Sequence, residues 1–264
     1  ARHVQAMGDC SIVRIVVLSD THGLHQRLQL PPGDVLIHCG DFANRGSLED
    51  VTSFSEWFKA QTNFKDRIVI AGNHDRDLKH PDAINLEEMF SSDAAGECAP
   101  IQFLKDQHCI CAGGRLRIFG TSWNTCAHDT YEDLDLKTDR VDLLLSHLPP
   151  YWPSRNSKVR RGSLSLAKIS FQNRIPITCG GHLHWARGAV QYTAETEDPG
   201  SPAHSLWFIN ASSQKSASNH DPPDQLEKDE DLVFPPIVIE YDAQRRQVVR
   251  IEGLDEHNML EKKI

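Results

Sequence analysis

Five apolar segments of the sequence each end in side chains of the types that bind metal ions. In chain order the metal-competent residues are Asp20, His22, Asp41, Asn73, His74, His147, His182 and His184. A structural zinc site is usually rich in thiolates, whereas this set offers oxygen and nitrogen donors that suit Mn, Fe or Zn. These donors outnumber what one ion accepts, and a carboxylate among them can bridge. The set therefore predicts two ions about 3.5–4 Å apart.

Two such ions would permit hydrolysis of a phosphate ester at neutral pH. Cations lower the pKa of bound water, so a hydroxide held between them would attack phosphorus in line. The ions would bind the non-bridging oxygens, where negative charge accumulates. His74, next to Asn73, would as an imidazolium assist departure of the alkoxide.

The segments before these residues have the composition of buried parallel strands, which are nearly continuous in apolar residues. The predicted strands are 12–19, 34–39, 67–70, 141–146 and 175–179. Between the second and third, residues 48–60 carry apolar positions at helical spacing, as in a βαβ unit. Because the carboxyl ends of parallel strands meet in one crevice, we expect the five groups of ligands to converge.

The rest of the chain predicts a single domain over residues 1–264 with a core at 12–212. Further strands are expected at 101–104, 109–111, 116–123 and 205–210, with a hairpin turn at 112–114. Residues 213–236 are poor in apolar residues and predict an exposed loop. A C-terminal hairpin at 237–252 and a frayed tail at 253–264 would complete the chain.

Composition limits the partners and the compartment. The net charge of −9, with 39% apolar and 25% charged residues, argues against a general nucleic-acid or membrane surface. Seven cysteines cannot all pair, and several lie in apolar segments, which predicts a reducing, cytoplasmic compartment. No apolar stretch reaches the roughly 18 residues of a membrane span, and residues 1–11 lack a signal-peptide apolar region. His25 and five other histidines are interpreted as ordinary surface or turn residues.

One window departs from the acidic character of the chain. Residues 143–194 contain no Asp or Glu but include Arg155, Lys158, Arg160, Arg161, Lys168, Arg174 and Arg187. This pattern indicates either a positive funnel that draws in an anionic substrate or the solvated face of a helix over residues 155–168. We expect Arg160 and Arg161 to contact substrate, together with Asn44 and Arg45.

The ordered set Asp-x-His, Gly-Asp, Gly-Asn-His-Asp, His and Gly-His-x-His resembles the calcineurin-like metallophosphoesterase superfamily. The resemblance covers about residues 12–212, and segments 70–74, 120–123, 146–150 and 208–212 resemble its metallophosphoesterase domain-containing branch. It implies an α/β fold, a four-layer αββα sandwich of two mixed sheets, with a dinuclear metal site above the C-terminal strand ends.

The resemblance also implies roles for individual residues. Asp20, His22, Asp41 and His184 would hold one metal, and Asp41 as a bridge with Asn73, His147 and His182 would hold the other. His74 would donate to the phosphoryl oxygen or the leaving group, and Asp75 would orient its ring. Leu148 stands where the branch commonly has Gly, and Trp185 where it commonly has an acidic residue. Both predict a pocket that admits a hydrophobic or aromatic part of the substrate.

The function expected from these observations is a metal-dependent phosphohydrolase that acts on a small anionic, phosphate-containing substrate. A phosphodiesterase is favoured over a phosphoprotein phosphatase because the compact, acidic chain has no evident insertion to form a groove for a protein. Two alternatives remain. One is a regulatory protein that binds a nucleotide with negligible turnover, and the other is a dinuclear Lewis-acid enzyme that acts on a non-phosphate molecule.

Overall fold

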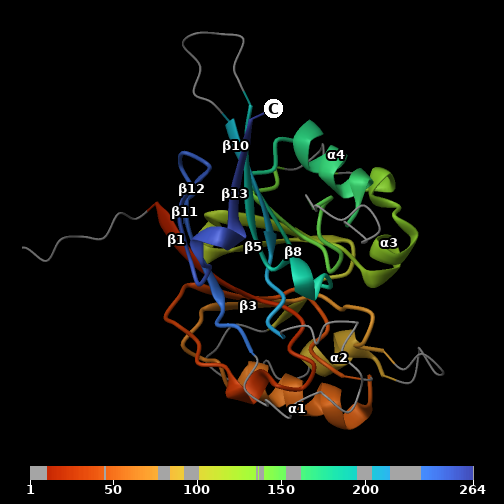
Figure 1. The fold of residues 1–264 in the computed structure, drawn as a ribbon. Helices are drawn as coiled ribbons and strands as arrows, with labels where there is room; N and C mark the ends of the chain where they lie inside the picture. Colours follow the sequence, from red (N-terminus) through yellow and green to blue (C-terminus); the bar gives the residue numbers. More distant parts are fainter. Residues whose placement is uncertain are drawn as a thin grey trace, which may run out of the picture.

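Two mixed β-sheets pack face to face, and helices cover the outer face of each (Figure 1). The structure is a computed structural model, and it describes residues 11–44, 46–76, 84–91, 101–134, 136, 140–152, 162–194, 204–214 and 233–263. The four layers are the predicted αββα sandwich. None of the described helices combines the length and apolar character needed to span a bilayer.

The first sheet has the strand order β12-β11-β1-β2-β3-β4. Its parallel strands are β1 (Ile12–Leu18), β2 (Val35–His38), β3 (Asp66–Val69) and β4 (Gln102–Phe103). The predicted hairpin of β11 (Ile237–Asp242) and β12 (Gln247–Glu252) extends this sheet, and β11 pairs antiparallel with β1. Strands β1, β2 and β3 run in the same direction, so their carboxyl ends lie at the same edge of the sheet.

The second sheet has the order β13-β9-β10-β8-β7-β6-β5. Its strands are β5 (Gln107–Cys111), β6 (Leu116–Gly120), β7 (Leu143–Leu145), β8 (Ile177–Gly180), β9 (Gly188–Ala194), β10 (His204–Asn210) and β13 (Met259–Lys263). Strands β6, β7, β8 and β10 are parallel, and β5 and β6 form the hairpin predicted around residues 112–114.

Four α-helices cover the sheets in the described part of the chain. They are α1 (Leu48–Lys59), α2 (Leu86–Ser91), α3 (Trp123–His128) and α4 (Leu164–Gln172). Short 3-10 helices lie at His25–Arg27, Ala112–Gly114, Tyr131–Asp133, His184–Ala186 and Glu256–Asn258. Figure 1 places α1 and α2 on the first sheet and α3 and α4 on the second.

Alternation along the strands divides the core into an inner and two outer layers. On β1, Val13, Ile15 and Val17 face the second sheet in one buried cluster, whereas Val16 and Leu18 face α1 and α2 in another. Successive strand residues point to opposite faces, so a strand buried on both sides must be apolar throughout. This is why β1 lacks a polar alternation in its sequence.

Helix α1 follows from its sequence. The side chain of Ser47 accepts a hydrogen bond from the backbone N–H of Asp50 at 3.1 Å and so caps the first turn. Val51, Phe54 and Phe58 are buried against the first sheet. Their spacing places them on one face of the helix, as predicted from the apolar positions over 48–60.

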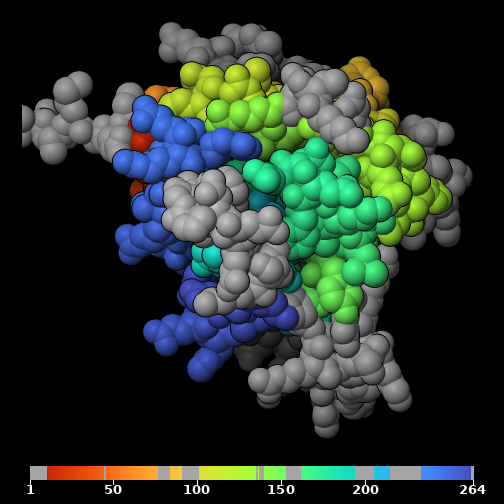
Figure 2. All heavy atoms as spheres, turned by 90° about the horizontal axis from the view of Figure 1, so that it is seen from above, coloured from red at the N-terminus to blue at the C-terminus, as the bar shows by residue number. Residues whose placement is uncertain are grey.

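The prediction of a frayed tail at 253–264 is wrong. Residues Met259–Lys263 form β13, which pairs in parallel with β9 at the edge of the second sheet. In Figure 2 the C-terminal segments, coloured blue, form one flank of the visible face. The short, charged sequence by itself predicts coil, and the segment becomes a strand because its backbone pairs with β9. Residues 215–232, most of the predicted exposed loop, lie outside the described residues.

Candidate metal centre

The predicted ligands lie at the carboxyl ends of five parallel strands, three from the first sheet and two from the second. They follow β1, β2, β3, β7 and β8 in the order predicted from the sequence. The site therefore lies across the seam between the two sheets. It consists of two clusters, Asp20 with His22 and His184, and Asp41 with His147 and His182.

In the first cluster, two imidazole rings and a carboxylate point their ligand atoms toward one position. Nε2 of His184 lies 3.2 Å from Oδ1 of Asp20 and 3.3 Å from Nε2 of His22. All three atoms lie within 4.8 Å of one another. Ligand atoms around a small cation with bonds of about 2 Å lie roughly 3–4 Å apart, so this donor set fits an ion.

In the second cluster the ring nitrogens of His147 and His182 converge on the carboxylate of Asp41 and the amide of Asn73. Oδ2 of Asp41 lies 3.2 Å from Nε2 of His147. Oδ1 of Asn73 lies 3.2 Å from that same nitrogen and 3.0 Å from Nδ1 of His182. The amide oxygen therefore belongs to the same donor set, as predicted.

Asp41 lies between the two clusters. Its Oδ2 atom is 3.2 Å from Nε2 of His147 in the second cluster and 3.9 Å from Nε2 of His22 in the first. A single carboxylate within reach of both donor sets has the position expected of a bridging ligand. The arrangement fits two metal ions that share Asp41.

The buried charges in the site are matched by ion pairing. Burial alone would raise the pKa of Asp20, but the hydrogen bond to His184 and the charges of His147 and His184 hold it well below its ordinary value. Burial likewise opposes the charge of Asp41, whose pKa is lowered by the charge of and hydrogen bond to His147. Burial would lower the pKa of His147, yet Asp41 raises it to about 10. The site favours ionised carboxylates, the form that binds cations.

Four of the ligands adopt a left-handed backbone conformation that side chains other than Gly rarely occupy. The φ angles are 55° for Asp20, 42° for His22, 56° for Asp41 and 62° for His182. Each such residue costs roughly 1–2 kcal/mol relative to a right-handed conformation. Strain of this kind persists where surrounding structure enforces it, and it gathers at functional sites. Four of the nine described non-glycine residues with positive φ are thus predicted ligands.

Two glycines provide the room that the carboxylates occupy. A Cβ atom on Gly72 would collide with Oδ1 of Asp41 and approach the ring of His147, and one on Gly181 would collide with Oδ2 of Asp20. Each Gly immediately precedes a ligand residue in the sequence. The glycines in the Gly-Asn-His-Asp and Gly-His-x-His patterns are therefore required by close packing around the ligands.

His74 is exposed and lies beside the first cluster, 4.9 Å from His22 between ring centroids. Its Nδ1 atom lies 2.6 Å from the backbone carbonyl of Asn44. Because a carbonyl only accepts, Nδ1 carries a proton, and Nε2 is the nitrogen that is left for substrate. The prediction that Asp75 orients this ring is wrong. Asp75 instead accepts three backbone N–H bonds, from Asp41, Ala43 and Gly72, at 2.7–2.8 Å.

Sequence reasoning assigned no role to two residues that position Asp20. Oδ2 of Asp20 accepts hydrogen bonds from the hydroxyl of Ser212 at 3.0 Å and from the backbone N–H of His182 at 2.9 Å. Asn210 accepts from Ser212 and donates to the carbonyl of Leu183 at 2.8 Å. Asn210 and Ser212 lie at the carboxyl end of β10, which is parallel to β8, so the strand-end pattern that identified the ligands also contained them.

The structure brings the predicted ligands together, but it does not do the same for the predicted substrate contacts. Leu148 is 2% exposed and packs in the apolar cluster between the second sheet and the helices α3 and α4. The prediction that Leu148 lines a substrate pocket is therefore wrong. Trp185 is 45% exposed. Asn44 contributes its backbone carbonyl to His74. Arg45, Arg160 and Arg161 lie outside the described residues.

The basic window is only partly a surface feature. Arg187 is buried and donates to the backbone carbonyls of Ala211, Ser212, Pro235 and Gly253. Lys168 pairs with Glu132 at 2.8 Å on the exposed face of α4. These two cations therefore do not contribute to a funnel. His25, expected at the surface, is 1% exposed and packs against Phe54 and Trp57.

The fold and the site together define an α/β protein with two candidate metal-binding clusters that share one carboxylate. The family model "Calcineurin-like phosphoesterase" matches residues 13–186, and the chain belongs to this family. Human metallophosphoesterase domain-containing protein 1 is 27% identical over 207 residues, an alignment that covers 67% of this chain and 62% of that protein. A UPF0046 protein of Caenorhabditis elegans is 30% identical over 154 residues, covering 52% of this chain and 54% of that protein.

These alignments span less than two thirds of the relatives' length. Among solved structures, the protein TT1561 of Thermus thermophilus has a TM-score of 0.52 at 13% identity, and the match covers 91% of this chain and 98% of that one. At this identity the likeness concerns the fold alone. The family model describes phosphoesterases, and the described residues include two clusters of side chains that could each hold a metal ion.

Proposed function

We propose that this protein hydrolyses a small anionic phosphodiester and that it uses two metal ions, Mn, Fe or Zn. The observation that carries the proposal is the position of Asp41, whose Oδ2 atom lies within 4 Å of imidazole nitrogens from both ligand clusters. When bound, two cations would activate water and neutralise the charge that develops on the phosphoryl oxygens. The family supports the reaction class.

The residues of the chain hold the ligands in place and move a proton. His74 carries a proton on Nδ1, where the carbonyl of Asn44 accepts its hydrogen bond. A second proton on Nε2 makes the ring cationic and allows it to protonate the departing oxygen. The exposure of His74 beside His22 supports a position at the point where substrate enters.

The charge of the chain favours a small substrate. A net charge of −9 disfavours general binding of nucleic acid, so anion recognition is expected to be local to the metal centre. The proposed compartment is the cytoplasm. All five described cysteines are free and buried, and burial raises the pKa of thiols such as Cys39 and Cys179, which fits a chain that keeps its thiols reduced.

The test is hydrolysis of an aryl phosphodiester and an aryl phosphomonoester by the full chain loaded with Mn²⁺, after its metal content has been measured. We expect wild type to turn over the diester faster than the monoester. Asp41→Asn removes a charge that both clusters use, so we expect metal content and turnover to fall together. The matched control is Asp133→Asn, an exposed carboxylate in the 3-10 helix Tyr131–Asp133 that belongs to neither ligand cluster, and it should behave as wild type.

Three results would contradict the proposal in different ways. Equal turnover by wild type and Asp41→Asn would show that the hydrolysis does not depend on this centre. Metal retention without hydrolysis of either ester would favour the regulatory or non-phosphate alternatives. A clear preference for the monoester would keep the metal chemistry and replace the diester as substrate.

A further inference from the structure

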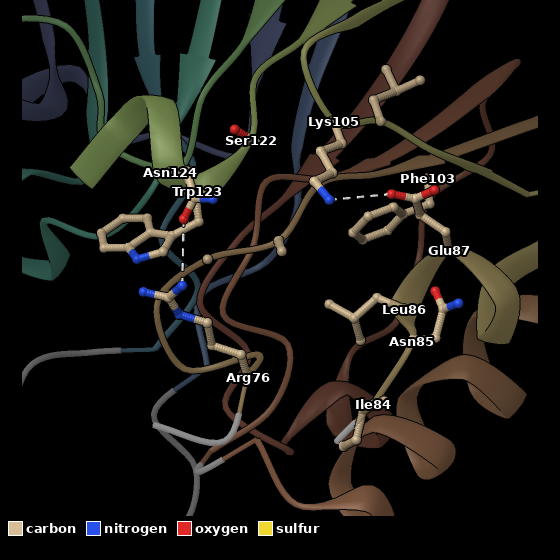
Figure 3. Close-up of a pocket in the computed structure, with 13 residues that line it drawn as sticks. Arg76, Ile84, Asn85, Leu86, Glu87, Phe103, Lys105, Ser122, Trp123 and Asn124 are labelled. Atoms are coloured by element: carbon tan, nitrogen blue, oxygen red, sulfur yellow. Dashed lines mark hydrogen bonds and ion pairs between the residues drawn. The ribbon is translucent and has the colours of Figure 1, made fainter. Parts of the chain in front are cut away.

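A pocket of about 410 Å³ opens beside the second ligand cluster, between α2 and α3 (Figure 3). Gly72, which immediately precedes the ligand Asn73, lines the pocket. Trp123 forms another wall, and its ring centroid lies 5.5 Å from that of His147 and 5.8 Å from that of His182. The pocket therefore adjoins the metal centre on the side of the second cluster.

The pocket is large enough for a ring-sized organic group, and much of its lining is apolar. Small-molecule pockets usually have volumes of roughly 300–1,000 Å³, and a cavity of about 150 Å³ accommodates benzene. The apolar and aromatic side chains of Ile84, Leu86, Phe103 and Trp123 face it. A planar apolar group would gain contact with the indole and would be removed from water there.

Of the two cationic side chains that line the pocket, Lys105 has a carboxylate partner and Arg76 has none among the described residues. Lys105 is paired with Glu87 at 3.5 Å, which balances its charge. Arg76 points toward Asn124, whose Oδ1 atom lies at a long 3.4 Å from the guanidinium (Figure 3). The Nε atom of Arg76 is buried without a hydrogen-bond partner, and no described carboxylate forms an ion pair with this side chain. A guanidinium stays charged in proteins, so Arg76, which pairs with no carboxylate of the described residues, offers a cation to an incoming anion.

We propose that this pocket binds the non-reacting ester group of the substrate, and that this group is planar, apolar and bears an anionic substituent. The phosphate would lie over the metal centre, the plane of the group would contact Trp123 and Leu86, and the anion would meet Arg76. The inference rests on the proposed function for the position of the phosphate. It places the hydrophobic part of the substrate away from Leu148, where the sequence suggested it.

The test compares three phosphodiesters that share the leaving group 4-nitrophenolate and differ in the retained group, which is methyl, phenyl or 4-carboxyphenyl. Using Mn²⁺-loaded full chain, we expect kcat/KM, corrected for the uncatalysed rate, to rise about tenfold from methyl to phenyl and again to 4-carboxyphenyl. Arg76→Gln should remove the increase in kcat/KM from phenyl to 4-carboxyphenyl and keep the increase from methyl to phenyl. Leu86→Ala should reduce the increase from methyl to phenyl.

Leu48→Ala is the matched control, because Leu48 is the first residue of α1 as Leu86 is of α2, and it is 60% exposed outside the pocket. It should show the wild-type ratios. Equal kcat/KM for the three esters in wild type, or ratios unchanged in Arg76→Gln and Leu86→Ala, would overturn the pocket inference and leave the proposed function standing.

A binding measurement separates the two proposals if no ester is hydrolysed, a result that would defeat the proposed function. The affinities of 4-carboxyphenyl phosphate and methyl phosphate for the metal-loaded chain would then be compared by calorimetry. The pocket inference predicts tighter binding of the 4-carboxyphenyl compound, with the difference lost in Arg76→Gln. Equal affinities would overturn it.

Discussion

Asp41 and His147 form a buried ion pair that joins the two sheets, with 3.2 Å between Oδ2 and Nε2. Asp41 follows β2 of the first sheet and His147 follows β7 of the second, and these strands do not pair with each other. The second ligand cluster therefore exists only when the sheets are packed through their shared apolar core. Metal binding and the packing of the two sheets are coupled through this contact.

Gly72→Ala is expected to abolish metal binding at the second cluster. The added Cβ atom would collide with the carboxylate of Asp41 and press on the ring of His147, so the two ligands could not keep their positions. Metal content and turnover of an aryl phosphodiester measure the effect. The control is Gly113→Ala, since Gly113 has a φ of 66° and open space around it. It should lower stability through backbone strain and retain the metals. Full metal content in Gly72→Ala would count against the packing argument.

Ser212→Ala is expected to weaken metal binding at the first cluster by roughly 10–100-fold, the usual cost of losing a hydrogen bond to a ligand. The variant leaves Asp20 without the hydroxyl that donates to its Oδ2 atom. Titration with Mn²⁺ measures the affinity. Ser213→Ala is the matched control, because Ser213 is equally buried but donates only a long 3.4 Å bond to the carbonyl of Ala211. Equal affinities of the two variants would refute the role of Ser212.

His74→Ala is expected to lower kcat by roughly 10²–10⁴-fold for an ester with a poor alkoxide leaving group, while the metals are retained. With 4-nitrophenolate as leaving group the loss should be much smaller, because that anion departs without a proton. The comparison of the two substrates measures proton donation directly. His257→Ala, at an exposed position, should leave both rates unchanged. An identical loss for both leaving groups would exclude His74 as the proton donor.

The stability of the protein is expected to fall as the pH drops from about 6.5 toward 4. Burial lowers the pKa of His25 to about 4 and that of His38 to about 3, and the Nδ1 atom of each is buried without a partner. An unfolded chain takes up protons near pH 6.5, whereas the folded chain does not, so acid favours unfolding. The stabilisation is complete above pH 6.5 and is lost through this window.

Urea unfolding in the presence of a chelator, from pH 8 to 4.5, measures this dependence. In His25→Phe, which keeps a ring against Phe54 and Trp57, the pH dependence should shrink by about one proton. His257→Phe, at an exposed site, should retain the full dependence. A free energy of unfolding that stays constant between pH 7 and 5 in wild type would contradict the prediction.

The ligands could be predicted from the sequence because each one follows a strand whose apolar composition is a local property. Sequence patterns do not show which side chain a backbone carbonyl will contact. The sequence therefore predicts that Asp75 orients the ring of His74, whereas the backbone carbonyl of Asn44 does so. The direction of a side chain after a strand depends on the turn, and for this reason Leu148 was expected in a pocket and lies in the core. Strand β13 was missed because a short, charged segment does not predict a strand, and its pairing with the uncharged β9 is a tertiary contact.

The central claim is that two ions share Asp41, and anomalous X-ray diffraction from crystals soaked in Mn²⁺ tests it most directly. We expect two anomalous peaks about 3.5–4 Å apart, one among Asp20, His22 and His184 and the other among Asn73, His147 and His182, with Asp41 within bonding distance of both. A single peak, no peak at these residues, or two peaks of which only one contacts Asp41 would contradict the account.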